Sequence, residues 1–151
     1  MIQRKQTVFL LLALVASVVC LCLPIGRFMP ESMGLGTEMY NLWIVDKTTG
    51  ACQYSVWALF AVLIVTCPVT LVAIFAYNNR RQQMRYCVFN MLLFIGWYVV
   101  YAVFALTLGN GAKFHPSFAC CLPFVAFVLT LLARKGISDD EKLVRAADRI
   151  R

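Results

Sequence analysis

The chain has 151 residues, of which 62% are hydrophobic and only 14% are charged, and its formal net charge at pH 7 is +7. Asp, Glu, Lys and Arg are excluded from four continuous stretches of at least 20 residues each. Because about 20 apolar residues in a helix cross a bilayer core that is about 30 Å thick, these stretches exclude a soluble globular domain and a disordered chain. They are also too uniformly apolar for the strands of a β-barrel, which alternate in polarity over about 10 residues. The uncharged stretches are residues 6–26, 48–79, 86–112 and 114–133.

These stretches predict transmembrane helices, because a segment within hydrocarbon must satisfy its own backbone N–H and C=O groups. The first helix is expected to remain attached, since no small-residue cleavage pattern follows its apolar core. We therefore expect an all-α, integral-membrane four-helix bundle over residues 1–133 and a short amphipathic C-terminal helix within residues 134–151. The expected spans lie near residues 7–25, 54–77, 86–108 and 117–133.

Lys and Arg are distributed unevenly between the two ends of such a bundle. With the N-terminus in the cytoplasm, the cytoplasmic segments 1–5, 80–85 and 134–151 hold 11 of the 14 Lys and Arg residues. The loops near residues 26–50 and 109–113 hold the other three. Short loops rich in Lys and Arg remain cytoplasmic, so both termini are expected inside and these two loops outside. The net positive charge suits this topology and anionic headgroups, so we expect the lipid bilayer, and no nucleic acid, as a partner.

Ionisable side chains within a membrane usually mark ion pathways or substrate sites, and the four uncharged stretches contain only one. His115 lies at the outer start of the last span, where contact with water is its simplest role. The lack of a buried acid argues against a proton-coupled exporter. Asn90, about one turn inside the third span, is expected to form a hydrogen bond to a neighbouring helix. Pro68 and Pro123 each remove a backbone donor within a span and are expected to kink their helices.

Seven cysteines raise the possibility of thiol chemistry, and five of them fall in the outer half of the expected layout. A quinone-linked thiol oxidoreductase needs a C-x-x-C pair, in which one thiolate attacks and the second resolves. This chain has C-x-C and vicinal C-C patterns instead, which also suit Cys as a small apolar residue. No Cys/His spacing matches a zinc site. We therefore expect no catalytic, cofactor-binding or metal-binding residues. The five outer cysteines are Cys20, Cys22, Cys52, Cys120 and Cys121.

The outer loop of residues 26–50 is long enough to cap the bundle but too short for a domain of its own. Alternating apolar residues flank the turn-forming residues 46–50, which predicts a short hairpin there.

The C-terminal segment has the pattern of a separate helix. Ser138 and Glu141 form an S-x-x-E capping box, which predicts that a helix begins there. Glu141 can also pair with Arg145 four residues later. Because residues 134–151 carry a net charge of only +2, we expect this helix to bind a protein surface rather than lipid headgroups. That surface is either the inner loop around residues 80–85 or a separate partner. The apolar stripe at helical spacing consists of Leu143, Val144, Ala147 and Ile150.

Three segments of the chain resemble the bacterial membrane family known as domain of unknown function 4293. They are the opening MIQRKQTVFLLLA, the inner loop AIFAYNNRRQQMRYCVFN and the end DDEKLVRAADRIR. The resemblance implies a four-helix protein of the bacterial inner membrane and carries over no catalytic or binding residues. It rests on Gln3, Arg4, Gln6, Thr7, Tyr77, Asn79, Arg80, Gln83, Arg85, Asn90, Asp140, Glu141, Lys142, Arg145, Ala147, Asp148 and Arg149.

The polar features of the sequence gather at the expected cytoplasmic face, whereas the expected membrane interior lacks ionisable chemistry. We therefore expect a non-enzymatic scaffold or accessory subunit that binds a protein partner, or a second copy of itself, through this face. Two alternatives stay open: a thiol–quinone oxidoreductase using the outer cysteines, and a transporter of neutral solutes, which only the two prolines support. The candidate docking residues are Arg80, Arg81, Arg85, Glu141, Leu143, Val144, Arg145, Ala147 and Ile150.

Overall fold

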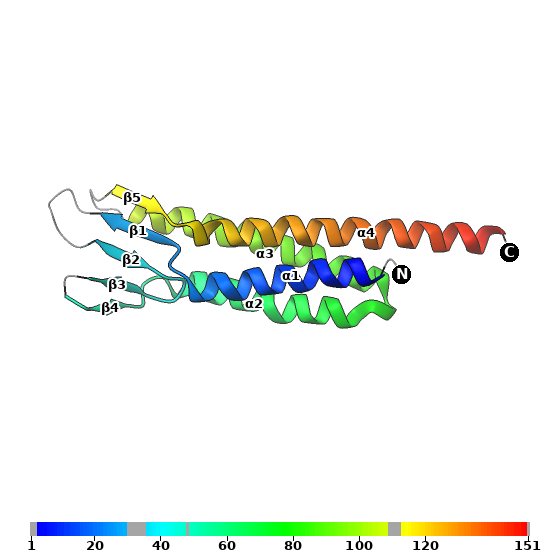
Figure 1. Cartoon of the computed structure of the whole chain (residues 1–151), viewed down its shortest axis with the longest axis horizontal. Helices are drawn as coiled ribbons and strands as arrows, with labels where there is room; N and C mark the ends of the chain where they lie inside the picture. Colours follow the sequence, from blue (N-terminus) through cyan, green and yellow to red (C-terminus); the bar gives the residue numbers. More distant parts are fainter. Residues whose placement is uncertain (1–2, 30–35, 48, 109–112, 151) are drawn as a thin grey trace.

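The computed structural model describes residues 3–29, 36–47, 49–108 and 113–150, with side chains described from Gln6 onward apart from residues 78, 145 and 147–150. Four helices lie along one another in an elongated bundle, with β-strands gathered at one end and both chain termini at the other (Figure 1). We refer to these as the sheet end and the terminal end. The helices are α1 (Gln3–Cys22), α2 (Trp57–Phe75), α3 (Arg80–Thr107) and α4 (Leu122–Ile150), with 3₁₀ turns η1 (Ala76–Asn78) and η2 (Phe118–Cys121).

Three helical segments in the described part of the chain are long and apolar enough to cross a membrane. The helix α1 contributes a shorter apolar stretch, Gln6–Cys22, which spans about 26 Å at about 1.5 Å per residue. Large apolar side chains face outward, as with Leu92 and Val99, which are 61% and 59% exposed. Polar side chains such as Thr66 lie inside, which is the distribution expected of helices in lipid. The three segments are Trp57–Phe75, Arg80–Thr107 and Phe118–Val144.

The helix α1 packs most extensively against α4. Their buried residues include Ala13 and Ala16 on α1 and Ala126 and Ala133 on α4. Small side chains let two helix backbones approach closely, which is a common means of helix association in membranes. Larger side chains from the other two helices fill the centre of the bundle, namely Leu59, Leu63, Phe94 and Trp97.

The sheet end carries a five-stranded antiparallel sheet with the strand order β4-β3-β2-β1-β5, so the expectation of an all-α protein is wrong in this part. The hairpin expected at residues 46–50 is confirmed, because β3 and β4 pair on either side of it. Gly50 lies in that turn with a φ of +69°, a conformation that glycine adopts without strain. The strands are β1 (Gly26–Met29), β2 (Thr37–Met39), β3 (Ile44–Asp46), β4 (Cys52–Gln53) and β5 (Lys113–Pro116).

The strand β5 joins the sheet from the other outer loop, far along the chain. Gly26 of β1 lies opposite Pro116, and Arg27 opposite His115. A Cβ atom on Gly26 would lie 2.6 Å from the ring of Phe114, so any larger residue at this position would force the ring to move. His115 is therefore an exposed strand residue at the sheet end. The pairing of β1 with β5 was not predicted from the sequence, because strands of two to four residues give almost no periodic signal.

The separate C-terminal helix expected from the capping box at Ser138 is not formed, because α4 runs without interruption to Ile150. Ser138 is thus an interior helix residue. Gly136 could have ended the last membrane-spanning helix before a separate C-terminal one. It instead packs against α1, where a Cβ atom on Gly136 would lie 3.2 Å from Cγ of Gln6. Tertiary packing on α1 thus outweighs the local cap signal.

The two prolines also behave differently from one another. Pro123 is the second residue of α4, where a missing N–H is tolerated because the first turn has no intrahelical partner for it. The kink expected at Pro123 is therefore wrong. Pro68 lies inside α2, which continues through it without a break.

Candidate docking surface at the terminal end

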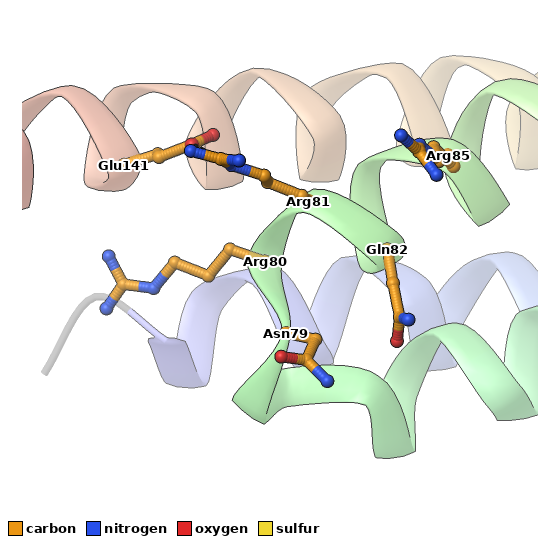
Figure 2. A pocket seen from close by; sticks show the side chains of 6 residues that line it. All are labelled: Asn79, Arg80, Arg81, Gln82, Arg85 and Glu141. Carbon is orange, nitrogen blue, oxygen red and sulfur yellow. Dashed lines mark hydrogen bonds and ion pairs between the residues drawn. The ribbon is translucent and has the colours of Figure 1, made fainter.

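The terminal end of the bundle brings together three elements that are far apart in sequence. The turn η1 links α2 to α3, and the first turn of α3 lies beside the second half of α4 and the start of α1 (Figures 1 and 2). The basic inner segment and the acidic segment of the chain therefore meet here.

A buried polar pair joins α1 to α4 at this end. The Nε2 of Gln6 donates a hydrogen bond to Oδ2 of Asp140 at 2.5 Å, and both side chains are buried. A buried carboxylate is costly unless it accepts hydrogen bonds. The amide of Gln6 therefore supplies what Asp140 needs and holds α4 against α1 beyond the apolar core.

The arginines of α3 contact the same turn of α4. Arg80 donates from Nη1 to the backbone oxygen of Asp140 at 3.1 Å. Arg81 forms an ion pair between Nε and Oε1 of Glu141 at 3.4 Å. Because the side chain of Arg81 is 77% exposed, water screens this ion pair, and exposed pairs contribute at most about 1 kcal/mol. The contacts orient the two segments more than they stabilise them.

A polar hollow of about 500 Å³ opens between these elements. Figure 2 shows Arg81 extending from α3 toward Glu141 on α4, with Arg85 farther along α3 and Asn79 at the turn before it. Three arginines and one glutamate line the hollow, so the lining carries a net positive charge. Its lining residues are Asn79, Arg80, Arg81, Gln82, Arg85 and Glu141.

The apolar stripe of the C-terminal segment is not covered where the structure describes it. Leu143 is 62% exposed and Val144 is 46% exposed. The last turns of α4 extend past the other three helices in Figure 1. The side chains of Arg145, Ala147 and Ile150 lie outside the described residues.

Asn90 lies deeper in the bundle and does not join this surface. Its Nδ2 donates to Oγ1 of Thr70 on α2 at 2.8 Å, and Thr70 in turn donates to the backbone oxygen of Thr66 at 2.7 Å. The amide oxygen of Asn90 is buried without a hydrogen-bond partner among the described residues. The contact links two helices, α2 and α3.

The seven cysteines are all free thiols. At the sheet end, Sγ of Cys20 donates to the backbone oxygen of Ala119 at 3.5 Å, which places Cys20 beside the vicinal pair Cys120 and Cys121. Cys22 and Cys52 are exposed. Within the described ranges, no three His, Cys, Asp or Glu side chains come together as metal ligands.

One important polar residue, Asn41, was not expected from the sequence. It is fully buried at the sheet end, where Nδ2 donates to the backbone oxygen of Cys20 at 2.7 Å. Nε1 of Trp97 donates to Oδ1 of Asn41 at 3.1 Å, and the backbone N–H of Phe60 donates to the backbone carbonyl of Asn41 at 3.1 Å. Asn41 therefore joins three helices, and a single Asn in a loop gives no sequence signal of this role.

The architecture defines the class of this chain: a helical bundle with segments able to span a membrane, capped by a small sheet. Within that class, the chain belongs to the family described as Domain of unknown function (DUF4293), whose model matches residues 2–150. The resemblance found in three segments of the sequence is thus confirmed over almost the whole chain. No curated protein sequence matches this chain.

Proposed function

We propose that this protein is a multi-pass accessory subunit or scaffold of the bacterial inner membrane that binds a protein partner at the terminal end. The observation that carries the proposal is the uncovered apolar pair Leu143 and Val144 on a projecting helix. This pair lies on the same helix as Glu141, which lines the arginine-rich hollow. An apolar patch beside a positively charged hollow is suited to an amphipathic, acidic protein segment.

The proposed orientation places the terminal end in the cytoplasm. Both termini and the segment at residues 80–85 lie at this end, and these segments carry 11 of the 14 Lys and Arg residues. Arg27, Lys47 and Lys113 belong to the sheet end. Because Lys and Arg in short loops favour the cytoplasmic side, the sheet faces the outer side in this proposal.

Binding suits the chemistry of the hollow better than catalysis does. Guanidinium groups remain protonated and donate hydrogen bonds in a fixed planar geometry, and the amides of Asn79 and Gln82 do not titrate. The carboxylate of Glu141 already pairs with Arg81. Such a set recognises carboxylates and phosphates, whereas a general acid or base must exchange protons near neutral pH.

The test is crosslinking in cells followed by mass spectrometry, with the wild-type protein compared to Leu143→Asp. We expect the substitution to leave membrane insertion intact and to abolish crosslinks from the terminal end. Gln53→Asp adds the same charge to an exposed position at the sheet end and serves as the matched control. If Leu143→Asp retains every crosslink and fully complements a deletion, the proposal is wrong. If the captured partner is a second copy of the chain, the surface is a homo-oligomer interface.

A thiol–quinone oxidoreductase at the sheet end is the second candidate. It is favoured by the contact of Cys20 Sγ with the backbone oxygen of Ala119, which places the thiol of Cys20 next to the turn η2 that carries Cys120 and Cys121. Alkylation under reducing and oxidising conditions, followed by intact mass measurement, tests it. Two outer cysteines that change together would support the oxidoreductase and weaken the scaffold proposal. A neutral-solute transporter now has only Pro68 in its favour, since Pro123 lies in the first turn of α4.

A further inference from the structure

A second hollow, of about 570 Å³, lies on the flank of the bundle between α3 and α4. It differs from the polar hollow at the terminal end because most of its lining is apolar. Its walls are formed by Met84, Val88, Phe89 and Leu92, with Arg81, Arg85 and Arg134. We call it the flank groove.

The charges and the apolar residues of the flank groove are separated along the helix axis. Arg85, Val88 and Leu92 follow one another at spacings of three and four residues, so they lie on one face of α3. At about 1.5 Å per residue, Leu92 lies about 10 Å from Arg85 toward the middle of the bundle. Arg134 contributes a second guanidinium from α4.

The apolar part of the groove continues toward the sheet end. A smaller hollow of about 140 Å³ lies between the same two helices and includes Ile95 and Phe127 in its lining. Ile95 continues the stripe of Leu92, and Phe127 lies seven residues, or two helical turns, before Arg134. The surface between α3 and α4 therefore presents an apolar track about 15 Å long, which runs from Arg85 toward the sheet end as far as Ile95.

Two of the three guanidinium groups have no anionic partner among the residues that the structure describes. Neither Arg85 nor Arg134 forms an ion pair with any carboxylate of the described residues, whereas Arg81 pairs with Glu141. Guanidinium groups bind phosphate oxygens through two parallel N–H donors. Two unpaired guanidinium groups at one end of an apolar track thus fit a molecule that has an anionic end and is apolar over the rest of its length.

We propose that the flank groove binds an anionic phospholipid of the adjoining leaflet, with its phosphate between Arg85 and Arg134 and an acyl chain along the track. The charge-free stretch of α3 begins at Tyr86, directly after Arg85, which places the guanidinium groups at headgroup depth. Basic pockets between transmembrane helices on the cytoplasmic side favour such headgroups. The flank groove shares Arg81 and Arg85 with the polar hollow, but it does not depend on Leu143 and Val144, the exposed apolar pair that carries the protein-docking proposal.

The experiment uses the full-length protein in detergent micelles, with phosphatidylglycerol and phosphatidylcholine of equal chain length as probes in native mass spectrometry. We expect phosphatidylglycerol to remain bound at collision energies that remove phosphatidylcholine. Arg134→Gln should weaken retention of phosphatidylglycerol about tenfold, since a hydrogen bond to a charged group is lost. Lys135→Gln removes the same charge from the neighbouring exposed residue and should retain the lipid.

A steric variant tests the apolar half of the site. Leu92→Trp fills the track and should expel the acyl chain, whereas Leu106→Trp makes the same change at an exposed position of α3 outside the groove. Circular dichroism and gel filtration verify that each variant is folded. Equal retention of the two lipids, equal losses for Arg134→Gln and Lys135→Gln, or unaffected binding in Leu92→Trp would each overturn the proposal. Full competition by water-soluble glycerol phosphate at equal concentration would also overturn it, because the acyl track would then contribute nothing.

Discussion

Gln6 and Asp140, 134 residues apart, form a buried hydrogen bond that joins the first helix of the chain to the last. Asp140 also lies at the point where α3 contacts α4 through Arg80. Asp140 therefore connects three helices at the terminal end. Its side chain binds α1, its backbone oxygen binds α3, and the residue itself belongs to α4.

Replacing Gln6 with Ala should lower stability, because the carboxylate of Asp140 would then be buried without its donor. The loss of a partner from a buried charged group costs about 1–3 kcal/mol. The thermal midpoint in detergent, followed by circular dichroism at 222 nm, measures the effect. Asp139→Ala is the control: its exposed ion pair with Lys142 contributes little. A Gln6→Ala protein with the same thermal midpoint as the wild type would show that the hydrogen bond adds no net stability.

Gly136→Ala and Gly96→Ala form a matched pair in two helices. A methyl group at Gly96 meets nothing within 4 Å, so Ala there should stabilise by up to about 1 kcal/mol through helix propensity. A methyl group at Gly136 meets Gln6, whose amide is held by Asp140. We expect Gly136→Ala to be the less stable of the two by thermal melting. The reverse order would mean that Gln6 moves aside without cost.

Asn41→Ala should destabilise the sheet end, because it removes the side-chain partners of Trp97 and of the Cys20 carbonyl. Each buried group left unpaired costs about 1–3 kcal/mol. Hydrogen exchange of the amides in β1 and β2 should become faster, while exchange at the terminal end stays unchanged. Asn79→Ala provides a control, since that side chain makes no cap hydrogen bond to α3. Slow exchange at both ends in Asn41→Ala would contradict the role assigned to it.

The sheet should weaken in acid through Glu38. Lys47, and then Arg27, hold the pKa of this carboxyl below its usual range, with Lys47 Nζ at 2.8 Å and Arg27 Nε at 3.3 Å. A lowered folded-state pKa means that the stabilisation is present at neutral pH. It is lost as the pH falls from about 4.3, the usual glutamate value, through the folded-state pKa.

Hydrogen exchange of β2 and β3, measured from pH 6 down to pH 3 and corrected for intrinsic rates, tests this pH dependence. Glu38→Gln should show weaker protection at pH 6 and a flatter pH profile than the wild type. A wild-type profile as flat as that of Glu38→Gln would show that the ion pairs do not contribute.

The proposed orientation predicts that a reporter fused after Arg151 is active only in the cytoplasm. A complementary probe, a membrane-impermeant thiol reagent, should label the exposed Cys52 of β4 from the outside of spheroplasts. Cys87, which is buried in α3, should stay unlabelled as long as the bundle is folded, so its labelling would reveal unfolded protein. A C-terminal reporter active on the outer side would overturn the orientation.

The helices were predictable from the sequence because the cost of burying charge in lipid is large and leaves long uncharged stretches. The contact of Arg81 with Glu141 was one of two alternatives that the sequence left open, since a basic inner loop and a C-terminal segment that begins with acids could meet each other or a separate partner. The sheet was not predictable beyond its hairpin. The pairing of β1 with β5 joins residues about 90 positions apart, and neither strand is long enough to show alternation.

The continuity of α4 was missed for a different reason. The S-x-x-E pattern at Ser138 is a local signal, whereas the packing of Gly136 on Gln6 is a tertiary one. The importance of Asn41 was missed likewise, because its partners Cys20, Phe60 and Trp97 come from three other elements. Residues whose roles depend on distant partners are invisible to reasoning from local patterns.

The pairing of β1 with β5 imposes a parity rule on the chain. Two hydrogen-bonded strands occupy the same compartment, so the segment between them must cross the bilayer an even number of times. The helices α2 and α3 therefore insert together or not at all in any chain that completes its sheet. Because β5 follows α3 in the chain, the sheet can close only after both α2 and α3 have been synthesised. A chain inserted with one crossing missing is left with an open strand edge at β1, which distinguishes it from a correctly inserted one.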